Sequence, residues 1–121
     1  MFTKIMNKRI RFTIILSTPN FPYQKALGYL TPKLGQFFAG ACCQQIDGVW
    51  SDDGEFDKSE YQIGKQEKGM KIHLSVMVDQ QEQTKLQIRQ VLQGLKDELN
   101  LAINWVHLEQ EEVTASHFQL Q

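Results

Sequence analysis

The stretch Met70–Val78 reads M-K-I-H-L-S-V-M-V, and it decides the class of fold that the chain can adopt. Apolar and polar side chains alternate along it, which is the period of a strand with one buried face. The buried face is predicted to carry Ile72, Leu74, Val76 and Val78, and the other face Lys71, His73, Ser75 and Met77. We therefore expect a sheet that is covered by the rest of the chain on one side.

A second stretch, residues 8–17, follows the same rule and reads K-R-I-R-F-T-I-I-L-S. Its inward positions would be Ile10, Phe12, Ile14 and Leu16, and its outward positions Arg9, Arg11, Thr13 and Ile15. Cys42–Trp50 and Ala102–Glu109 complete the set of predicted strands. The chain thus offers four strands, two of them strongly patterned.

Two segments carry apolar residues at the three- and four-residue spacing of amphipathic helices. The first follows Pro22 and ends before Gly40, and its Thr31-Pro32 pair predicts either a kink or a second short helix capped by Thr31. The second begins at Asp79, an expected N-cap with Glu82 three residues later, and ends at Asn100. Both helices should therefore pack an apolar stripe against the sheet.

The connections are less clearly patterned. Residues 51–58 predict a loop, and residues 61–69 fit either a hairpin arm or a longer loop. We treat residues 1–121 as a single domain, with 1–7 and 110–121 as loosely held ends. The C-terminal tail has a second interpretation, as an additional strand at the sheet edge.

The resulting element order, β-α-β-β-α-β, resembles the ferredoxin-like fold, and the resemblance rests on this order alone. It implies an α+β domain with a four-stranded antiparallel sheet and two helices on one face. The order is also similar to that of dimeric α+β barrel proteins. In those proteins two sheets pack face to face, and the enclosed space binds or transforms small molecules. Such a superfold does not by itself define a function.

Composition excludes several classes of partner. The chain has 121 residues and a formal net charge of −1, without the basic excess of proteins that bind nucleic-acid phosphates. The adjacent Cys42 and Cys43 are expected to be free thiols, as in a reducing cytoplasm. No segment has the pattern of a signal peptide or a membrane span. We expect a cytoplasmic protein that does not bind a membrane, and nucleic acid is not the partner that the composition favours.

The helix-free face of the sheet is the candidate functional surface. Five polar residues could form a site for a small anionic ligand there: Arg11, Thr13, His73, Ser75 and His107. Three apolar residues, Ile15, Met77 and Trp105, are predicted to contact a second subunit, with Val106 and Leu108 in place of Trp105 if Trp105 faces the helices. Exposed side chains of an open sheet without any ligand are the simpler interpretation of the same pattern.

Motifs for other chemistry are missing from the sequence. The carboxylates of Asp52, Asp53, Glu55 and Asp57 do not have the spacing of a calcium loop and suit a solvated turn. The cysteines and histidines lack zinc-site spacing, and no nucleophile motif or phosphate loop occurs. The outward strand positions hold no aromatic residue for stacking RNA bases. We expect no cofactor, no metal and no catalytic residue.

Three hypotheses on function follow. The first is a non-enzymatic binding module that forms a homodimer through the open sheet face, with a small molecule as a second partner. Another is an enzyme with a sheet-lined pocket, in which His73 or His107 serves as acid–base and Arg11 holds an anion. The third is a regulator that binds a protein or an RNA.

Overall fold

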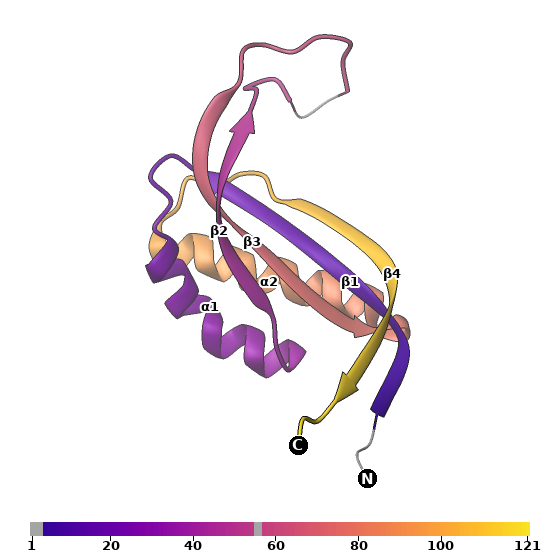
Figure 1. Cartoon of the computed structure of the whole chain (residues 1–121). Helices are drawn as coiled ribbons and strands as arrows, with labels where there is room; N and C mark the ends of the chain where they lie inside the picture. The colour runs from indigo at the N-terminus through magenta and orange to yellow at the C-terminus, as the bar shows by residue number, and fades with distance from the viewer. Residues whose placement is uncertain (1–3, 55–56) are drawn as a thin grey trace.

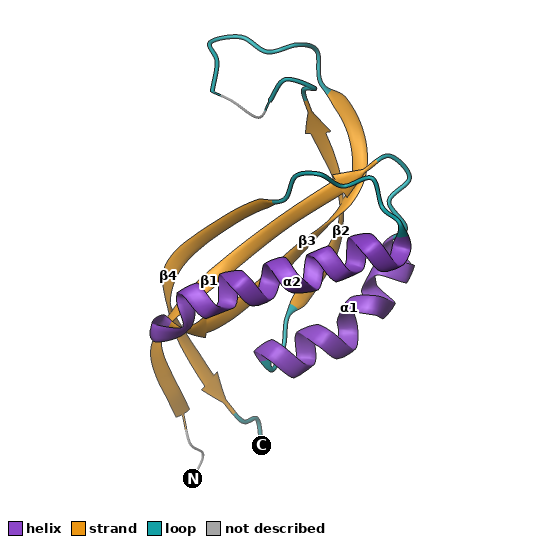
Figure 2. Ribbon diagram, turned by 180° about the vertical axis from the view of Figure 1, so that it is seen from behind, coloured by secondary structure: helices purple, strands orange, loops and turns teal. Residues whose placement is uncertain are grey.

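A computed structural model describes residues 4–54 and 57–121, with side chains from residue 7 onward (Figure 1). The elements follow in the order β1 (Lys4–Thr18), α1 (Tyr23–Phe38), β2 (Cys42–Trp50), β3 (Lys65–Met77), a short 3-10 helix (Val78–Gln80), α2 (Gln81–Leu99) and β4 (His107–Phe118). The strands form one antiparallel sheet in the order β2-β3-β1-β4, and both helices lie on the same face (Figure 2). The prediction of a ferredoxin-like α+β fold is confirmed.

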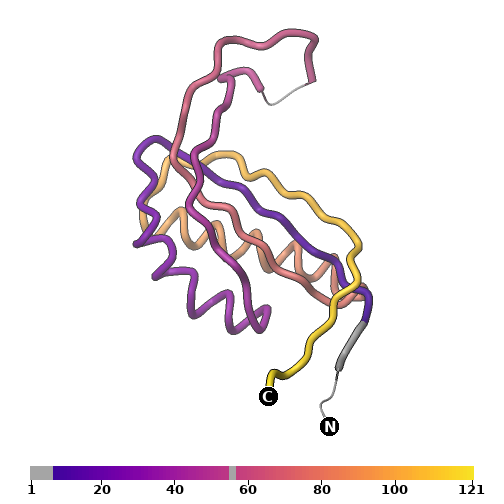
Figure 3. The backbone as a smooth tube through the Cα atoms, in the orientation of Figure 1, coloured from indigo at the N-terminus to yellow at the C-terminus, as the bar shows by residue number. Residues whose placement is uncertain are grey.

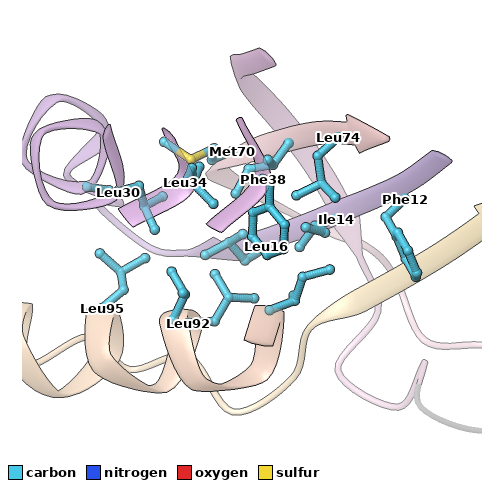
Figure 4. Packing of buried hydrophobic residues seen from close by; sticks show 14 of the residues in the cluster. Phe12, Ile14, Leu16, Leu30, Leu34, Phe38, Met70, Leu74, Leu92 and Leu95 are labelled. Atoms are coloured by element: carbon cyan, nitrogen blue, oxygen red, sulfur yellow. The ribbon is translucent and has the colours of Figure 1, made fainter. Parts of the chain in front are cut away.

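The core fills the space between the sheet and the helices (Figure 4). Phe12, Ile14 and Leu16 of β1 alternate with outward residues, and Leu30 of α1 and Leu95 of α2 are completely buried. The remaining buried apolar side chains include Ile10, Leu34, Phe38, Met70, Ile72, Leu74, Val76, Ile88, Val91, Leu92 and Ile103. The alternation predicted for β1 and β3 is confirmed except at Val78, which was predicted to be buried but lies in the 3-10 turn after β3 and is exposed.

Helix α1 is continuous, although Pro32 lies inside it. Pro32 lacks an amide hydrogen, and the hydroxyl of Thr31 donates a hydrogen bond to the carbonyl of Leu27, 2.7 Å away. The alternative of a second helix capped by Thr31 is wrong. Ala39, rather than Gly40, adopts the left-handed conformation that ends the helix.

Helix α2 begins later than predicted. A single 3-10 turn separates it from β3, so its N-cap is Gln80, and no side chain caps this end. The expected cap at Asp79 is therefore wrong. The predicted end is confirmed, because Asn100 takes the left-handed conformation and its amide hydrogen-bonds to carbonyls of the last turn. Within the described chain, no helix combines the length and the apolar character that crossing a membrane requires.

The last strand is the main correction. It was predicted over residues 102–109, whereas β4 spans His107–Phe118 and pairs with β1 along its length, from Ile15 opposite His107 to Lys4 opposite Phe118. Residues 4–7 and 110–118 are thus strand rather than loose ends, and no fifth strand occurs in the described chain. Most side chains of β4 are exposed on both faces, so its sequence lacks the alternation by which the other strands were found.

The β2–β3 hairpin extends beyond the sheet as an arm, with the ladder continuing to Trp50 opposite Lys65 (Figure 1). The hairpin interpretation of residues 65–69 is therefore correct, and residues 61–64 belong to the loop. The C-terminus lies at the opposite end of the molecule from this arm (Figure 3). Glu55 of the acidic loop lies outside the described residues, as does Phe56.

Candidate functional site

The open face of the sheet brings together four of the predicted ligand residues. Arg11 of β1 is directly opposite Ser75 of β3, and Thr13 is opposite His73. Directly opposite residues on antiparallel strands point to the same face. These four side chains therefore form a continuous polar area over the two central strands, and their role in ligand binding remains a prediction.

Arg11 is already occupied by a carboxylate of the neighbouring strand. Its Nε donates a hydrogen bond to Oε1 of Glu111, 3.1 Å away, and a terminal nitrogen of the guanidinium contacts the same oxygen. Glu109 stands beside Thr13 on β4. A shallow hollow of about 430 Å³ lies here, and two of the side chains that line it are acidic. These surroundings favour pairing within the chain over capture of an anion.

The two histidines of this face do not converge. His73 is opposite Thr13, whereas His107 is opposite Ile15 on the other side of β1. Two strand spacings and a shift of two residues place their backbones about 12 Å apart. Nε2 of His107 lies 3.1 Å from Oε2 of Glu109. The structure therefore does not assemble a His73–His107 acid–base pair.

The three residues predicted as an interface are separated along the sheet. Ile15 is half-buried near one end of β1, and Met77 pairs with Arg9, about 20 Å further along the strand. Trp105 lies in the connection between α2 and β4, before the first strand pair, and its side chain is 70% exposed. Ile103, two residues earlier, is buried in the core instead. These three residues do not form one patch by themselves.

A second hollow on the open face was missed by the sequence analysis. A hollow of about 610 Å³ lies between the base of the β2–β3 arm and the connection that enters β4. Trp50 and Trp105 line it from opposite elements, together with Ile15, Ser17, Glu67 and His107. We call these six residues the tryptophan hollow. No signal in the sequence joins them, because they come from four segments that meet only in the folded sheet.

Contacts between neighbouring residues fix the positions of Glu67 and Trp50 in the tryptophan hollow. The hydroxyl of Ser17 donates a hydrogen bond to Oε1 of Glu67 across the β1–β3 pair, at 2.9 Å. The Trp50 indole lies over Gly48, since a Cβ at that position would be 2.8 Å from Cε2 of the ring and closer still to its Nε1. Glycine at position 48 thus permits the indole to lie against the sheet. The hollow therefore combines an aromatic surface with a carboxylate that a neighbouring strand fixes in place.

The acidic loop next to this hollow is paired with lysines. Nζ of Lys58 lies 2.9 Å from Asp53, and Nζ of Lys65 lies 2.7 Å from Asp52. The hydrogen bond from Lys58 is the main reason that the pKa of Asp53 is lowered. Hydrogen bonding to Asp52 raises the pKa of Lys65. Over residues 4–54 and 57–121, no three His, Cys, Asp or Glu side chains are grouped as metal ligands would be.

Cys42 and Cys43 point to opposite faces of β2. Cys42 is exposed and opposite His73 on the open face, whereas Cys43 is half-buried and contacts the core. Burial, and to a lesser degree the neighbouring Cys42, raises the pKa of the Cys43 thiol. Because the thiolate is the reactive form, Cys43 should be the less reactive of the two.

This difference predicts the rates of alkylation by iodoacetamide. A Cys42→Ser variant, which leaves Cys43, should react several-fold more slowly near pH 8 than a Cys43→Ser variant, which leaves Cys42. The rate for Cys43 should continue to rise at more alkaline pH, because its raised pKa moves thiolate formation upward. Mass spectrometry of timed samples measures both rates, and guanidinium-unfolded samples should remove the difference. Equal rates in the folded protein would contradict the assigned orientations.

No protein-family model matches this sequence, and no curated protein matches it either. Among solved structures, CutA from Synechococcus elongatus shares 13% identity and a TM-score of 0.45, covering 95% of this chain and 85% of CutA. The PII-like protein CPII from Thiomonas intermedia shares 10% identity and a TM-score of 0.43, covering 95% and 99%. B. subtilis GlnK, solved with ATP, shares 13% identity and a TM-score of 0.44, covering 84% and 82%. We draw no functional conclusion from likenesses of this degree.

Proposed function

We propose that this protein is a non-enzymatic binding module that forms a homodimer through the open face of its sheet. One observation carries the proposal: no described segment covers this face, although it holds partly exposed apolar side chains on every strand. Those side chains are Ile46 and Trp50 on β2, Met77 on β3, Ile15 on β1 and Val113 on β4. An uncovered face of this kind gains free energy when it packs against another surface.

A second copy of the chain is the occupant that the charges favour. Arg9, Arg11 and Lys71 stand on the two central strands, while Glu109 and Glu111 stand on β4. A two-fold axis parallel to the strands and through the middle of the face places β4 of one copy over β2 of the other, and β1 over β3. Glu109 would then lie above Cys42, directly beside His73 and close to Lys71. A face with a single sign of charge would repel its own copy.

The size of the face is sufficient for such a dimer. Four strands at ordinary spacing, each about ten residues long, give a flat area of about 600 Å². Side-chain relief increases the accessible area toward the roughly 800 Å² per partner of a standard stable interface. The tryptophan hollow lies at one end of the face, so a partner copy would cover it. We propose this covered hollow as the place where a small molecule binds.

The test is the mass of the protein in solution. Analytical ultracentrifugation at micromolar concentration should give twice the mass of one chain. Ile15→Arg, which places a cation directly opposite Lys71 on the open face, should shift the dissociation constant at least about a hundredfold, because an uncompensated charge would be buried beside another cation. Val113→Arg, directly opposite Arg9, should act in the same direction from β4.

Leu86→Arg is the matched control. Leu86 is 64% exposed on α2, on the other side of the molecule, so the same charge there should leave the mass unchanged. Circular dichroism establishes that each variant is folded before its mass is interpreted. A wild-type monomer, or an oligomer that both open-face variants leave intact, would exclude this interface.

A further inference from the structure

The helix side of the molecule has a second groove, which meets the tryptophan hollow at Trp105 and otherwise lies away from the proposed dimer face. Helix α2 packs over the central strands and leaves the inner face of β4 uncovered (Figure 2). The groove between α2 and the β4 side has a volume of about 460 Å³. This is within the range of small-molecule sites in proteins.

The floor of this groove is apolar. Ile88 and Leu92 of α2 and the buried Ile103 line it from within the core. Val106 and Leu108 are 41% and 38% exposed beside them, and Trp105 is 70% exposed at the rim. Leu108 is opposite Ile14, whose side chain is in the core, so it points to the helix side. An apolar ligand of modest size would bury surface that is now in water.

The helix wall of the groove is cationic. Lys85, Arg89 and Lys96 lie on the side of α2 that lines it, and none of the described residues that line the groove is acidic. Lys85 is paired with Glu82 at 3.2 Å, and Lys96 donates to the side-chain oxygen of Asn104 at 3.0 Å. Arg89 has no hydrogen-bond or ion-pair partner among residues 4–54 and 57–121. Within the described part of the chain, its guanidinium is therefore free to meet a ligand at the edge of the apolar groove.

We infer that this groove binds a small amphipathic anion. Its hydrocarbon body would lie on the side chains of Val106 and Leu108, and its carboxylate or phosphate head at Arg89. The two halves of such a ligand match the two halves of the groove. A guanidinium can bind either head with two parallel hydrogen bonds, and Lys85 and Lys96 add positive potential on both sides. A neutral apolar ligand would leave Arg89 unused, and a cationic one would be repelled.

Trp105 provides the reporter for the test. In a Trp50→Phe background it is the only tryptophan, so its emission can be followed during titration with decanoate or decyl phosphate below their micelle concentrations. We expect saturable binding of at least one of these anions. Decyltrimethylammonium and decanol should bind at least about tenfold more weakly. Hexanoate, four methylenes shorter, should also lose at least about tenfold.

Arg89→Gln should weaken anion binding at least about tenfold without affecting decanol. Lys25→Gln, which removes one exposed cation from α1, should change it less than about twofold. Leu108→Gln should reduce the ratio of the affinity for decanoate to the affinity for hexanoate, because it makes the floor of the groove less apolar. Equal binding of anionic and cationic amphiphiles, or an unchanged affinity in Arg89→Gln, would overturn the inference. If neither decanoate nor decyl phosphate binds saturably, the inference is overturned as well. This holds even if the protein sediments with anionic vesicles, because that would indicate a membrane surface rather than a small ligand. The open-face variants of the dimer test are expected to bind decanoate with unchanged affinity. Failure of the dimer proposal can therefore be distinguished from failure of this inference.

Discussion

Phe12→Ala is expected to lower the free energy of unfolding by about 4 kcal/mol. The Phe12 side chain is completely buried beneath the helices, at the centre of β1, the strand that pairs with both β3 and β4. Removing the ring loses its burial and leaves a cavity that the flanking side chains cannot fill. Urea denaturation followed by circular dichroism measures the change.

Leu86→Ala serves as the control for this measurement. Leu86 is 64% exposed on α2, and alanine has a slightly better helix propensity, so its effect should stay within about 0.5 kcal/mol. If Phe12→Ala were as mild as this control, Phe12 could not be the buried centre of the sheet. The orientation of its neighbours Arg11 and Thr13 on the open face would then also be in question.

Gly69→Ala is expected to destabilise the protein by about 3 kcal/mol, through a clash rather than a cavity. Gly69 is buried in β3, opposite Ser17 of β1. A Cβ there would lie 2.8 Å from Cβ of Ser17 and closer still to the backbone carbonyl of Leu16. Because β1 is held by β3 and β4, this backbone cannot move away cheaply. Thermal and urea unfolding would both report the loss.

Gly28→Ala is the matched control. Gly28 lies on an exposed position of α1, and a Cβ there would meet nothing within 4 Å. The same substitution should therefore stabilise the protein by about 0.5 to 1 kcal/mol, since alanine favours helix. Opposite signs for the two glycines are the expected result. A neutral Gly69→Ala would mean that β1 and β3 are further apart than described.

The open face shows why sequence reasoning located some site residues and missed others. Arg11, Thr13, His73 and Ser75 lie on strands whose buried faces are strongly apolar, so their orientation follows from alternation alone. Glu109 and Glu111 were missed as partners because β4 is an uncovered edge strand with no such alternation. The Arg11–Glu111 contact thus depends on a pairing that local sequence does not encode.

The tryptophan hollow and the α2–β4 groove depend even more on tertiary structure. Trp50 is at the end of β2, and Trp105 is in a connection more than fifty residues later. Both line the hollow because the β2–β3 arm and the entry to β4 meet at the same end of the sheet. The separation of the two tryptophans in the sequence does not predict that they lie close together, since their proximity follows from strand order and register.

The sequence by itself determined the class of fold, the two central strands, the extent of β2 and the end of α2 at Asn100. These features are local, because burial on one face and helix ending are each expressed within a few residues. Tertiary structure alone decided the position of β4, the separation of His73 from His107 and the partner of Arg11. The residues of Met70–Met77 that point to the open face can therefore be predicted from the alternation. The side chains that surround them are decided by how β1, β2 and β4 pair in the sheet.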